Sequence, residues 1–400
     1  MGPITSFDEQ IAILTQGAAE IIETEELRRK LARGKPLVAK LGIDTTAPVI
    51  TLGHAVVLRR LSAFQKLGHR AVFLIGDETA RVGDPSGRSD TRAALDEAAV
   101  EEAANAFLAQ VGAILDLSQV EVRRNSEWLR ALGFSGALQL ASRSTVARML
   151  EREDFLKRFR ENQPIYLHEL IYPLMQGYDS VALEADVELG ATEQKFNLLM
   201  GRQLQRDHGM EPQVLVMMPI LTGLDGSHKM SKSLGNFVAI NEAPDEMFGK
   251  LMSIPDHLIP EYLLLAGDMA PADVDVRRRQ LAAGSRNPRD LKAEMAERTV
   301  ALYHGLAAAD SARERFFATF SRHEVPADAP SIRLGDAERS DLAAVLVRAG
   351  LVASIGEARR LADQGGVRAG DARLSWDQDL RSHVGDTLRV GKHRFLRIQA

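Results

Sequence analysis

The apolar residues at the start of the chain recur first at a helical spacing and then in short continuous runs. The range 7–33 carries an apolar face of helical period, which predicts a helix over that range. A continuous apolar run follows at 37–43, a helical pattern at 53–67, and a second apolar run at 70–75. Strand, helix and strand at this spacing form a βαβ unit, so we expect a parallel sheet.

Helical patterns dominate the rest of the chain and are interrupted by further apolar runs. Short strands are expected at 185–189 and 213–221, and the segments 120–123 and 125–129 separate two of the longer helical stretches. The side chain of Thr192 is suited to cap a helix that runs to about residue 207. The other expected helices lie at 93–115, 136–160, 168–179, 256–265, 271–283 and 288–304.

The C-terminal end differs in character from the body. The Pro- and Ala-containing stretch 321–330 reads as part of a linker, and two helices with short strands and Gly turns follow. We therefore expect four segments: an α/β domain at 1–240 with a helical insertion at about 125–185, a helical domain at 241–325, a linker at 326–341, and a small α+β domain at 342–400.

Composition narrows the class of protein. Of the 400 residues, 45% are hydrophobic and 26% are charged, as in an ordinary globular protein. No apolar run is long enough to span a bilayer, and the N-terminal segment lacks the basic flank of a signal peptide. The absence of cysteine excludes a disulfide framework and a thiolate metal site, and it agrees with a cytoplasmic location.

Charge is distributed unevenly along the chain. The net charge is −5, yet residues 340–400 contain ten basic and seven acidic side chains, which leaves −8 on the rest. A basic terminal domain on an acidic body is a modest indication of RNA contact.

Two short segments carry candidate chemistry. Lys229-Met230-Ser231-Lys232-Ser233 lies among glycines, directly after an apolar run. Two lysines three residues apart on such a loop are suited to holding oxygen atoms that move during a reaction. Far upstream, Leu52-Gly53-His54 follows a strand-like run and opens a helix, whose N-terminus favours anions. Either segment alone is more simply explained as a surface loop or a helix cap.

Together and in this order, the two segments resemble the HIGH and KMSKS signatures of class I aminoacyl-tRNA synthetases. The resemblance implies a Rossmann-like catalytic domain that uses ATP, with Mg²⁺ accompanying it, and no protein-bound metal or organic cofactor. The segment Gly83-Asp84-Pro85-Ser86-Gly87 matches neither a dinucleotide fingerprint nor a P-loop. The catalytic residues implied are Thr46, His54, Lys229 and Lys232, and the ATP-binding residues implied are Asp44, Gly53, His54, Ala191, Glu193, Lys229 and Lys232.

A narrower resemblance covers the segment 170–179. Tyr172, Gln176 and Asp179 fall on one face of a helix, as they would in a plain amphipathic helix. The segment is also similar to the tyrosine-pocket helix of tyrosyl-tRNA synthetases. This resemblance implies that Asp179 binds the substrate phenol and that Tyr172 and Gln176 bind its ammonium. The implied tyrosine-binding set is Asp84, Tyr172, Gln176, Asp179 and Gln194, with Asn125 and Trp128 nearby.

The C-terminal part shows two further similarities. The range 287–305 is similar to the helical anticodon-side region of the family, and 346–367 resembles a small RNA-binding domain shared with a ribosomal protein. The resemblance implies tRNA(Tyr) as a partner and a homodimer, with no membrane contact. The residues expected to meet RNA phosphates are Arg348, Arg359, Arg360, Arg368, Arg389, Lys392 and Arg394.

Four positions depart from the family pattern. Thr51 stands where the family usually has His, Thr45 where it has Pro, Ala191 where it has Gly, and Glu193 where it has Asp. All four lie in segments around the nucleotide, while the tyrosine-pocket set is intact. The leading interpretation is a tyrosine–tRNA ligase. The alternatives are a divergent paralogue that activates a tyrosine analogue and an inactive RNA-binding regulator; tryptophan specificity is disfavoured by the terminal RNA-binding domain.

Overall fold

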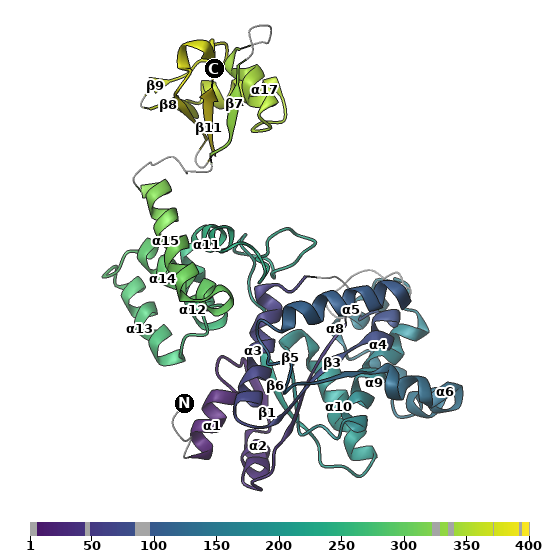
Figure 1. Ribbon diagram of the computed structural model, residues 1–400. Helices are drawn as coiled ribbons and strands as arrows, with labels where there is room; N and C mark the ends of the chain where they lie inside the picture. Colours follow the sequence, from purple (N-terminus) through teal and green to yellow (C-terminus); the bar gives the residue numbers. More distant parts are fainter. Residues whose placement is uncertain are drawn as a thin grey trace. The chain divides into compact units, whose positions relative to one another are not determined.

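The chain forms two compact units in the computed structural model, Met1–Ala309 and Asp310–Ala400 (Figure 1). None of the described helices is long and apolar enough to cross a membrane. The structure describes residues 6–44, 49–84, 97–321, 329–334, 340–370, 372–391 and 394–399.

The first unit is built on a six-stranded sheet with the order β1-β6-β5-β2-β3-β4. All neighbouring strands are parallel except β1, which pairs antiparallel with β6. The parallel sheet and the α/β class predicted from the βαβ pattern are therefore confirmed. The strands are β1 (Glu20–Ile22), β2 (Val38–Ile43), β3 (Arg70–Ile75), β4 (Glu121–Arg124), β5 (Val187–Ala191) and β6 (Val214–Met218).

Helices lie on both sides of this sheet (Figure 1). The helices that precede the insertion are α1 (Phe7–Leu14), α2 (Thr24–Leu31), α3 (Leu52–Lys66), α4 (Asp77–Val82) and α5 (Glu97–Val111). The strand β5 is followed by the 3₁₀ turn η1 (Thr192–Gln194) and α10 (Lys195–Asp207). After β6 and a long loop come α11 (Pro244–Met252), η2 (Asp256–Leu258), α12 (Ile259–Leu265), α13 (Pro271–Ala282), α14 (Pro288–His304) and α15 (Leu306–Ser321).

A helical insertion separates β4 from β5. It contains α6 (Ser126–Ala141), α7 (Val146–Met149), α8 (Glu153–Arg160) and α9 (Leu167–Ala182), which pack around an apolar cluster that includes Phe155 and Leu174. The helices α9 and α10 approach closely at Gly177, where an added Cβ would lie 3.1 Å from the backbone carbon of Met200. This contact fixes α9, which carries the predicted tyrosine-binding residues, against the core of the first unit.

Three predicted helices differ from the observed ones. The range 7–33 is broken because Gly17 adopts a φ of 74° and the next residues pair with β6 as β1. The range 136–160 is divided among α6, α7 and α8, and α6 itself is kinked at Gly133, whose φ is 59°. Thr192 does not cap α10, because η1 begins at that residue and α10 starts only after Gln194.

The second unit contains a five-stranded sheet with the order β7-β11-β10-β8-β9. The helices α16 (Leu342–Arg348) and α17 (Ile355–Asp363) contribute to its apolar core. The first strand lies in the range 326–341 that the sequence suggested as a linker, because its backbone pairs in parallel with β11. The strands are β7 (Ser331–Arg333), β8 (Val367–Ala369), β9 (Ala372–Arg373), β10 (Thr387–Val390) and β11 (Arg394–Gln399).

Candidate active site

The strand order reverses between β2 and β5, and in open parallel sheets such a reversal forms a crevice at the carboxyl ends of the strands. The chain passes from β2 to β3 and β4 on one side, and then returns to β5 and β6 on the other. Parallel sheets bind ligands where the strand order reverses in this way. Asp44 directly follows β2, and Glu193 lies in the turn directly after β5. Two of the residues expected to bind ATP therefore flank the crevice.

His54 lies in the first turn of α3, beside the end of β2. Its Nδ1 atom accepts a hydrogen bond from the Thr51 backbone N–H at 3.2 Å, and the Thr51 hydroxyl lies 2.8 Å from the same atom. Because the backbone N–H only donates, Nδ1 is the acceptor and the imidazole proton sits on Nε2. Burial, together with the charge of Lys232, lowers the pKa of His54 to about 4. At pH 7 this side chain is a neutral donor.

The two predicted signature segments meet in the structure. An added Cβ at Gly53 would lie 4.0 Å from the Cβ of Met230. The ammonium of Lys232 donates to the carbonyl of Val49 at 3.1 Å, and the ammonium of Lys229 pairs with the Glu193 carboxylate at 3.0 Å. We call the loop between β6 and α11, which carries both lysines, the lysine loop. It is thus tied to both sides of the crevice.

Polar side chains hold the lysine loop in a defined shape. Asp225 accepts from the backbone N–H groups of Ser227 and His228 at 3.1 Å, and these donors lower its pKa. Asn236 accepts from the Ser231 N–H at 2.8 Å and donates to the Lys229 carbonyl at 3.1 Å. These contacts make the backbone of the loop an ordered support for the two lysines.

The helix α9 places the predicted tyrosine-binding side chains against the carboxyl ends of the strands. The Tyr172 hydroxyl donates to Asp44 Oδ2 at 2.9 Å. Asp179 accepts from the Trp128 indole N–H at 2.7 Å and from the Asn125 amide at 3.4 Å. The Gln176 side chain is partly exposed, and its backbone carbonyl lies 3.5 Å from the Lys40 ammonium.

The other two predicted tyrosine-binding residues contact each other. The Gln194 amide donates to Asp84 Oδ2 at 2.7 Å. Arg152, only 6% exposed, lies 3.5 Å from Asp84 Oδ1. Asn197 donates to the carbonyl oxygen of the Gln194 side chain at 3.0 Å and so fixes the orientation of that amide. The structure therefore joins Asp84 and Gln194 in one hydrogen-bonded group.

The pKa values of two carboxyl groups in this polar group, Asp44 and Asp179, are raised. Burial, together with the charges of Asp84 and Asp179, raises the pKa of Asp44 to about 7. Burial likewise raises the pKa of Asp179 to about 7, against the opposing charge of Lys40. Lys40 forms a buried ion pair with Glu188 at 2.9 Å. A cationic ligand would stabilise the ionised carboxylates, so the pocket is suited to an ammonium group.

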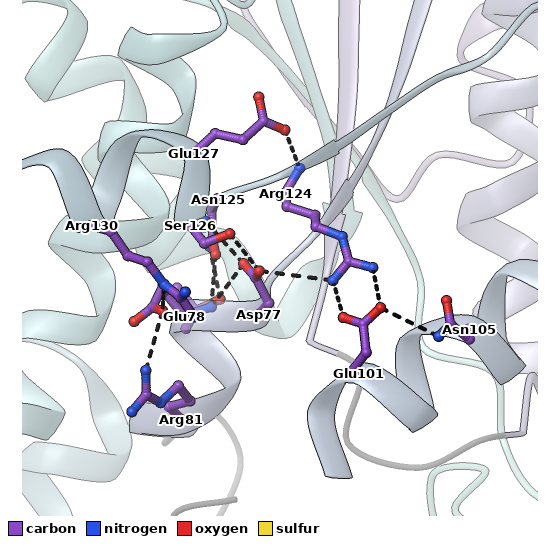
Figure 2. Close-up of polar contacts among 11 residues, drawn as sticks. Asp77, Glu78, Arg81, Glu101, Asn105, Arg124, Asn125, Ser126, Glu127 and Arg130 are labelled. Carbon is purple, nitrogen blue, oxygen red and sulfur yellow. Dashed lines mark hydrogen bonds and ion pairs between the residues drawn. The ribbon is translucent and has the colours of Figure 1, made fainter. Parts of the chain in front are cut away.

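A polar network outside the pocket fixes Asn125 (Figure 2). Asp77 accepts from the Ser126 N–H at 2.9 Å and from the Ser126 hydroxyl at 2.5 Å. The Asn125 side chain accepts from the Glu78 N–H at 3.0 Å and donates to the Thr79 hydroxyl at 3.0 Å. This network locks the start of α4 to the start of α6, so that Asn125 faces both Thr79 and Asp179.

Several site residues were not identified from the sequence. Thr79 donates to Asp44 at 2.7 Å and connects it to Asn125, and Arg152 neighbours Asp84. The position of Thr79 just after β3 was a usable signal, since strand ends gather at one edge of the sheet. Asp44, assigned to ATP from the sequence, also joins the Tyr172 network. Thr46 lies outside the described residues.

The described residues contain no group of three or more His, Cys, Asp or Glu side chains arranged to hold a metal ion.

The predicted RNA-binding residues lie on two parts of the second unit. Arg348, Arg359 and Arg360 are exposed on α16 and α17, and the guanidinium of Arg359 lies 3.7 Å from the ring centroid of Trp376. Arg394 is exposed at the start of β11, and Lys392 lies outside the described residues.

Three arginines align across the sheet of the second unit. In the strand register, Arg368 is the direct partner of Arg389 on one side and of Arg373 on the other. Direct cross-strand partners share a face, and like charges so placed repel each other. Within the described ranges, none of the three has an acidic ion-pair partner. We call Arg373, Arg368 and Arg389 the arginine row; Arg373 was missed because register is not visible in the sequence.

Comparisons with known proteins agree with this geometry. The sequence profile of the family described as "tRNA synthetases class I (W and Y)" matches residues 32–321. A tyrosine–tRNA ligase of Moorella thermoacetica is 50% identical, with 97% of this chain and 95% of the relative covered. One from Carboxydothermus hydrogenoformans is 49% identical, with 99% of each covered.

Solved structures share the fold. The tyrosyl-tRNA synthetase of Archaeoglobus fulgidus, complexed with L-tyrosine, superposes with a TM-score of 0.64 at 23% identity, covering 77% of this chain and 100% of that one. The enzyme of Aeropyrum pernix gives a TM-score of 0.61 at 22% identity, covering 79% of this chain and 99% of that one.

Proposed function

This chain belongs to the class I tRNA synthetases of the tryptophan and tyrosine family, and we propose that it is a tyrosine–tRNA ligase. It activates L-tyrosine with ATP and transfers the tyrosyl group to the 3′ end of tRNA(Tyr). The relatives that are about half identical over nearly the whole chain carry that activity in their names.

The observation that carries tyrosine specificity is the buried Asp179. Its carboxylate accepts from Trp128 and Asn125, which hold it in place to accept a further hydrogen bond from a phenol. A site built to hydrogen-bond a substrate hydroxyl rejects the analogue that lacks it, because its buried polar group is then left unpaired. Tyrosyl-tRNA synthetases are the known case of this effect, with a discrimination against phenylalanine of about 10⁵.

Activation requires alignment and charge stabilisation rather than an enzyme nucleophile. A carboxylate oxygen of tyrosine bonds to the α-phosphorus of ATP. The bond between that phosphorus and the oxygen that bridges to the β-phosphate breaks, and pyrophosphate leaves with its Mg²⁺. The Nε2–H of His54 donates to phosphate oxygens as charge develops on them, and it does so as a neutral group. Lys229 and Lys232 neutralise the departing pyrophosphate.

Asp44 and Asp84 bind the ammonium of tyrosine, while Asp179 binds the phenol at the other end of the substrate. The charge of Asp84 contributes to the raised pKa of Asp44, and Tyr172 and Gln194 are hydrogen-bonded to Asp44 and Asp84, respectively. A cation among them relieves their mutual repulsion and fixes the substrate carboxylate at the crevice between β2 and β5. Positioning of this kind converts a bimolecular attack into an effectively unimolecular step.

The second unit supplies the contact with tRNA. The arginine row presents three guanidinium groups on one sheet face without acidic partners among the described residues, an arrangement suited to the phosphates of RNA. The exposed arginines of α16 and α17 add to this basic surface. The proposed reaction places the protein in the cytoplasm, where ATP and tRNA are available.

We also propose that two copies of the chain associate through the helical insertion. Large apolar side chains are exposed on its helices, among them Phe134 and Leu167, each 80% exposed. Further exposed examples on the same insertion are Leu138, Val146, Phe159 and Tyr166. Surfaces of this kind mark interaction sites, and a second copy buries them symmetrically.

Tyrosine-dependent exchange of labelled pyrophosphate into ATP tests the proposed activity. We expect exchange with tyrosine and none above background with phenylalanine or tryptophan. The variant Asp179→Asn keeps the size of the side chain and should raise the KM for tyrosine more than the KM for ATP. Failure of all three amino acids to support exchange would overturn the proposal. Exchange with tyrosine but no charging of tRNA would assign the chain to a paralogue with another acceptor.

A further inference from the structure

The carboxylate of Glu193 forms an ion pair with Lys229, the first lysine of the lysine loop. Glu193 lies in η1, directly after β5, and its Oε2 atom is 3.0 Å from the Nζ atom of Lys229. The two side chains are 33% and 43% exposed, so the pair is accessible to ligand and to solvent. The first lysine of the loop is therefore paired with an anionic group of the chain itself.

The loop that carries Lys229 is held at its base, so the position of this lysine is set by the fold. The Thr222 N–H donates to Glu261 on α12 at 2.7 Å, and the Thr222 carbonyl accepts from the Tyr262 hydroxyl at 2.6 Å. Gly223 lies so close to Asn236 that an added Cβ would be 2.1 Å from its amide nitrogen. The base of the loop is thus held by α12, and the ion pair with Glu193 forms farther along the loop, at Lys229.

The two lysines tie the loop to opposite sides of the crevice. Lys232 binds the Val49 carbonyl, which follows β2, while Lys229 binds Glu193, which follows β5. These two strands flank the point where the strand order reverses. The loop thus spans the proposed ATP site like a strap. Of its two contacts across the site, one is with a backbone carbonyl and the other is with a carboxylate.

We infer that Glu193 is a positioning residue that controls the phosphate affinity of Lys229. This inference rests on the proposed function, because it takes Lys229 to be a ligand of the ATP phosphates. One ammonium beside a carboxylate has lost much of its attraction for a phosphate chain, and the carboxylate itself repels that chain. Binding of the triphosphate therefore requires Lys229 to exchange Glu193 for phosphate oxygens. Glu193 holds the strap in place before ATP arrives and weakens the binding of the phosphates.

Inorganic tripolyphosphate with Mg²⁺ isolates this effect, because it carries the phosphates of ATP but no ribose or adenine. Its affinity for the whole protein is measured by calorimetry in the absence of tyrosine. We expect Glu193→Gln to bind tripolyphosphate about two- to fivefold more tightly, the range that exposed ion pairs contribute. Glu193→Asp retracts the carboxylate but keeps its charge, so its affinity should lie between those of the wild type and the Gln variant.

Two controls separate this role from a general change of charge or structure. Glu20→Gln removes a carboxylate from a similarly exposed pair with Lys195, 2.6 Å apart, and should leave the tripolyphosphate affinity unchanged. In a Lys229→Gln background, Glu193→Gln should give a smaller gain, since only the direct repulsion between the carboxylate and the phosphates is then removed. Adenosine affinity reports any contact of Glu193 with the ribose and is read separately.

Weaker or unchanged tripolyphosphate binding by Glu193→Gln would overturn the inference. So would an equal gain in Glu20→Gln, or a gain that is equally large in the Lys229→Gln background. Because calorimetry with tripolyphosphate requires no amino acid, these outcomes remain distinct from a failure of tyrosine activation in the exchange assay.

Discussion

At the residue scale, the site is organised around one neutral histidine. The family pattern has a second histidine where Thr51 stands, and the structure shows what the threonine does instead. Its backbone N–H and hydroxyl both meet His54 Nδ1, which leaves the imidazole proton on Nε2. Such a contact fixes the tautomer and orientation of a catalytic imidazole.

Replacement of His54 should impair activation far more than replacement of the residue that orients it. We expect His54→Ala to reduce kcat for tyrosine-dependent pyrophosphate exchange by about 10²- to 10³-fold, the usual loss of one donor to a developing oxyanion. Thr51→Val removes one hydrogen bond and should reduce kcat about fivefold. A Thr51→Ser variant keeps the hydroxyl and serves as the control; equal losses in Ser and Val variants would contradict the assigned role.

The carboxylates predict how tyrosine binding depends on pH. The pKa values of Asp44 and Asp179 are raised to about 7 in the folded chain, above the ordinary value of 3.8. The folded protein therefore holds protons that the unfolded chain has released, and these groups lower its stability as the pH rises from about 4 to 7. The ammonium of tyrosine favours the ionised form of Asp44, and the phenol, which donates a hydrogen bond, favours that of Asp179, so tyrosine binding releases protons.

Tyrosine should accordingly bind more tightly at pH 8 than at pH 6, and the increase in Tm that it causes should also be larger at pH 8. Calorimetry at pH 7 in two buffers of different ionisation enthalpy measures the protons released. Asp44→Asn should reduce that number. A tyrosine affinity that is constant between pH 6 and 8 would show that bound tyrosine does not couple to the titration of these carboxylates.

At the scale of the elements, the sequence predicted what local patterns encode. The apolar runs that became β2 and β3, and the spacing of Tyr172, Gln176 and Asp179 on α9, are visible along the chain itself. The strand β1 has only three residues and exists because it pairs with β6, a contact that no local pattern reveals. The same is true of the ion pair between Glu193 and Lys229, which depends on how the loop crosses the sheet.

The lysine loop depends on Asn236, whose side chain is 6% exposed. Asn236→Ala removes its bonds to Ser231, Lys229 and Asp225. We expect kcat/KM for ATP to fall about tenfold or more, because loss of several hydrogen bonds at about 1 kcal/mol each leaves the lysines poorly placed. Tyrosine affinity, measured without ATP, should be unchanged. An equal loss of tyrosine affinity would indicate a general structural defect instead.

At the scale of the whole molecule, charged substitutions on the helical insertion should weaken the proposed association of two copies. Phe134→Asp and Leu167→Asp place a charge on the exposed apolar surface of the insertion, and each should shift the chain toward monomers in sedimentation equilibrium. Leu306→Asp is a matched control, since Leu306 is 75% exposed but lies on α15. If the wild type sediments as a monomer at micromolar concentration, the proposed interface is wrong.

The proposed RNA-binding residues and the proposed tyrosine- and ATP-binding residues lie in different units, so tRNA binding and tyrosine activation should be separable by mutation. The arginine row belongs to the second unit, and every residue assigned to tyrosine and ATP belongs to the first. The triple variant Arg368→Gln, Arg373→Gln, Arg389→Gln should therefore leave tyrosine-dependent pyrophosphate exchange unchanged while it raises the KM for tRNA in the charging assay.

The salt dependence of tRNA binding makes this prediction specific to phosphate contacts. Each phosphate contact contributes about −0.7 to −0.9 to the slope of log affinity against log salt concentration. Loss of three contacts should make the slope shallower by about two to three, whereas loss of uncharged contacts would lower affinity at every salt concentration alike. Arg359→Gln is the comparison variant, since its guanidinium already stacks on Trp376, and it should change the slope by one at most. A triple variant that charges tRNA as well as the wild type would remove the arginine row from the RNA-binding surface and leave the helices α16 and α17 as its remaining candidates.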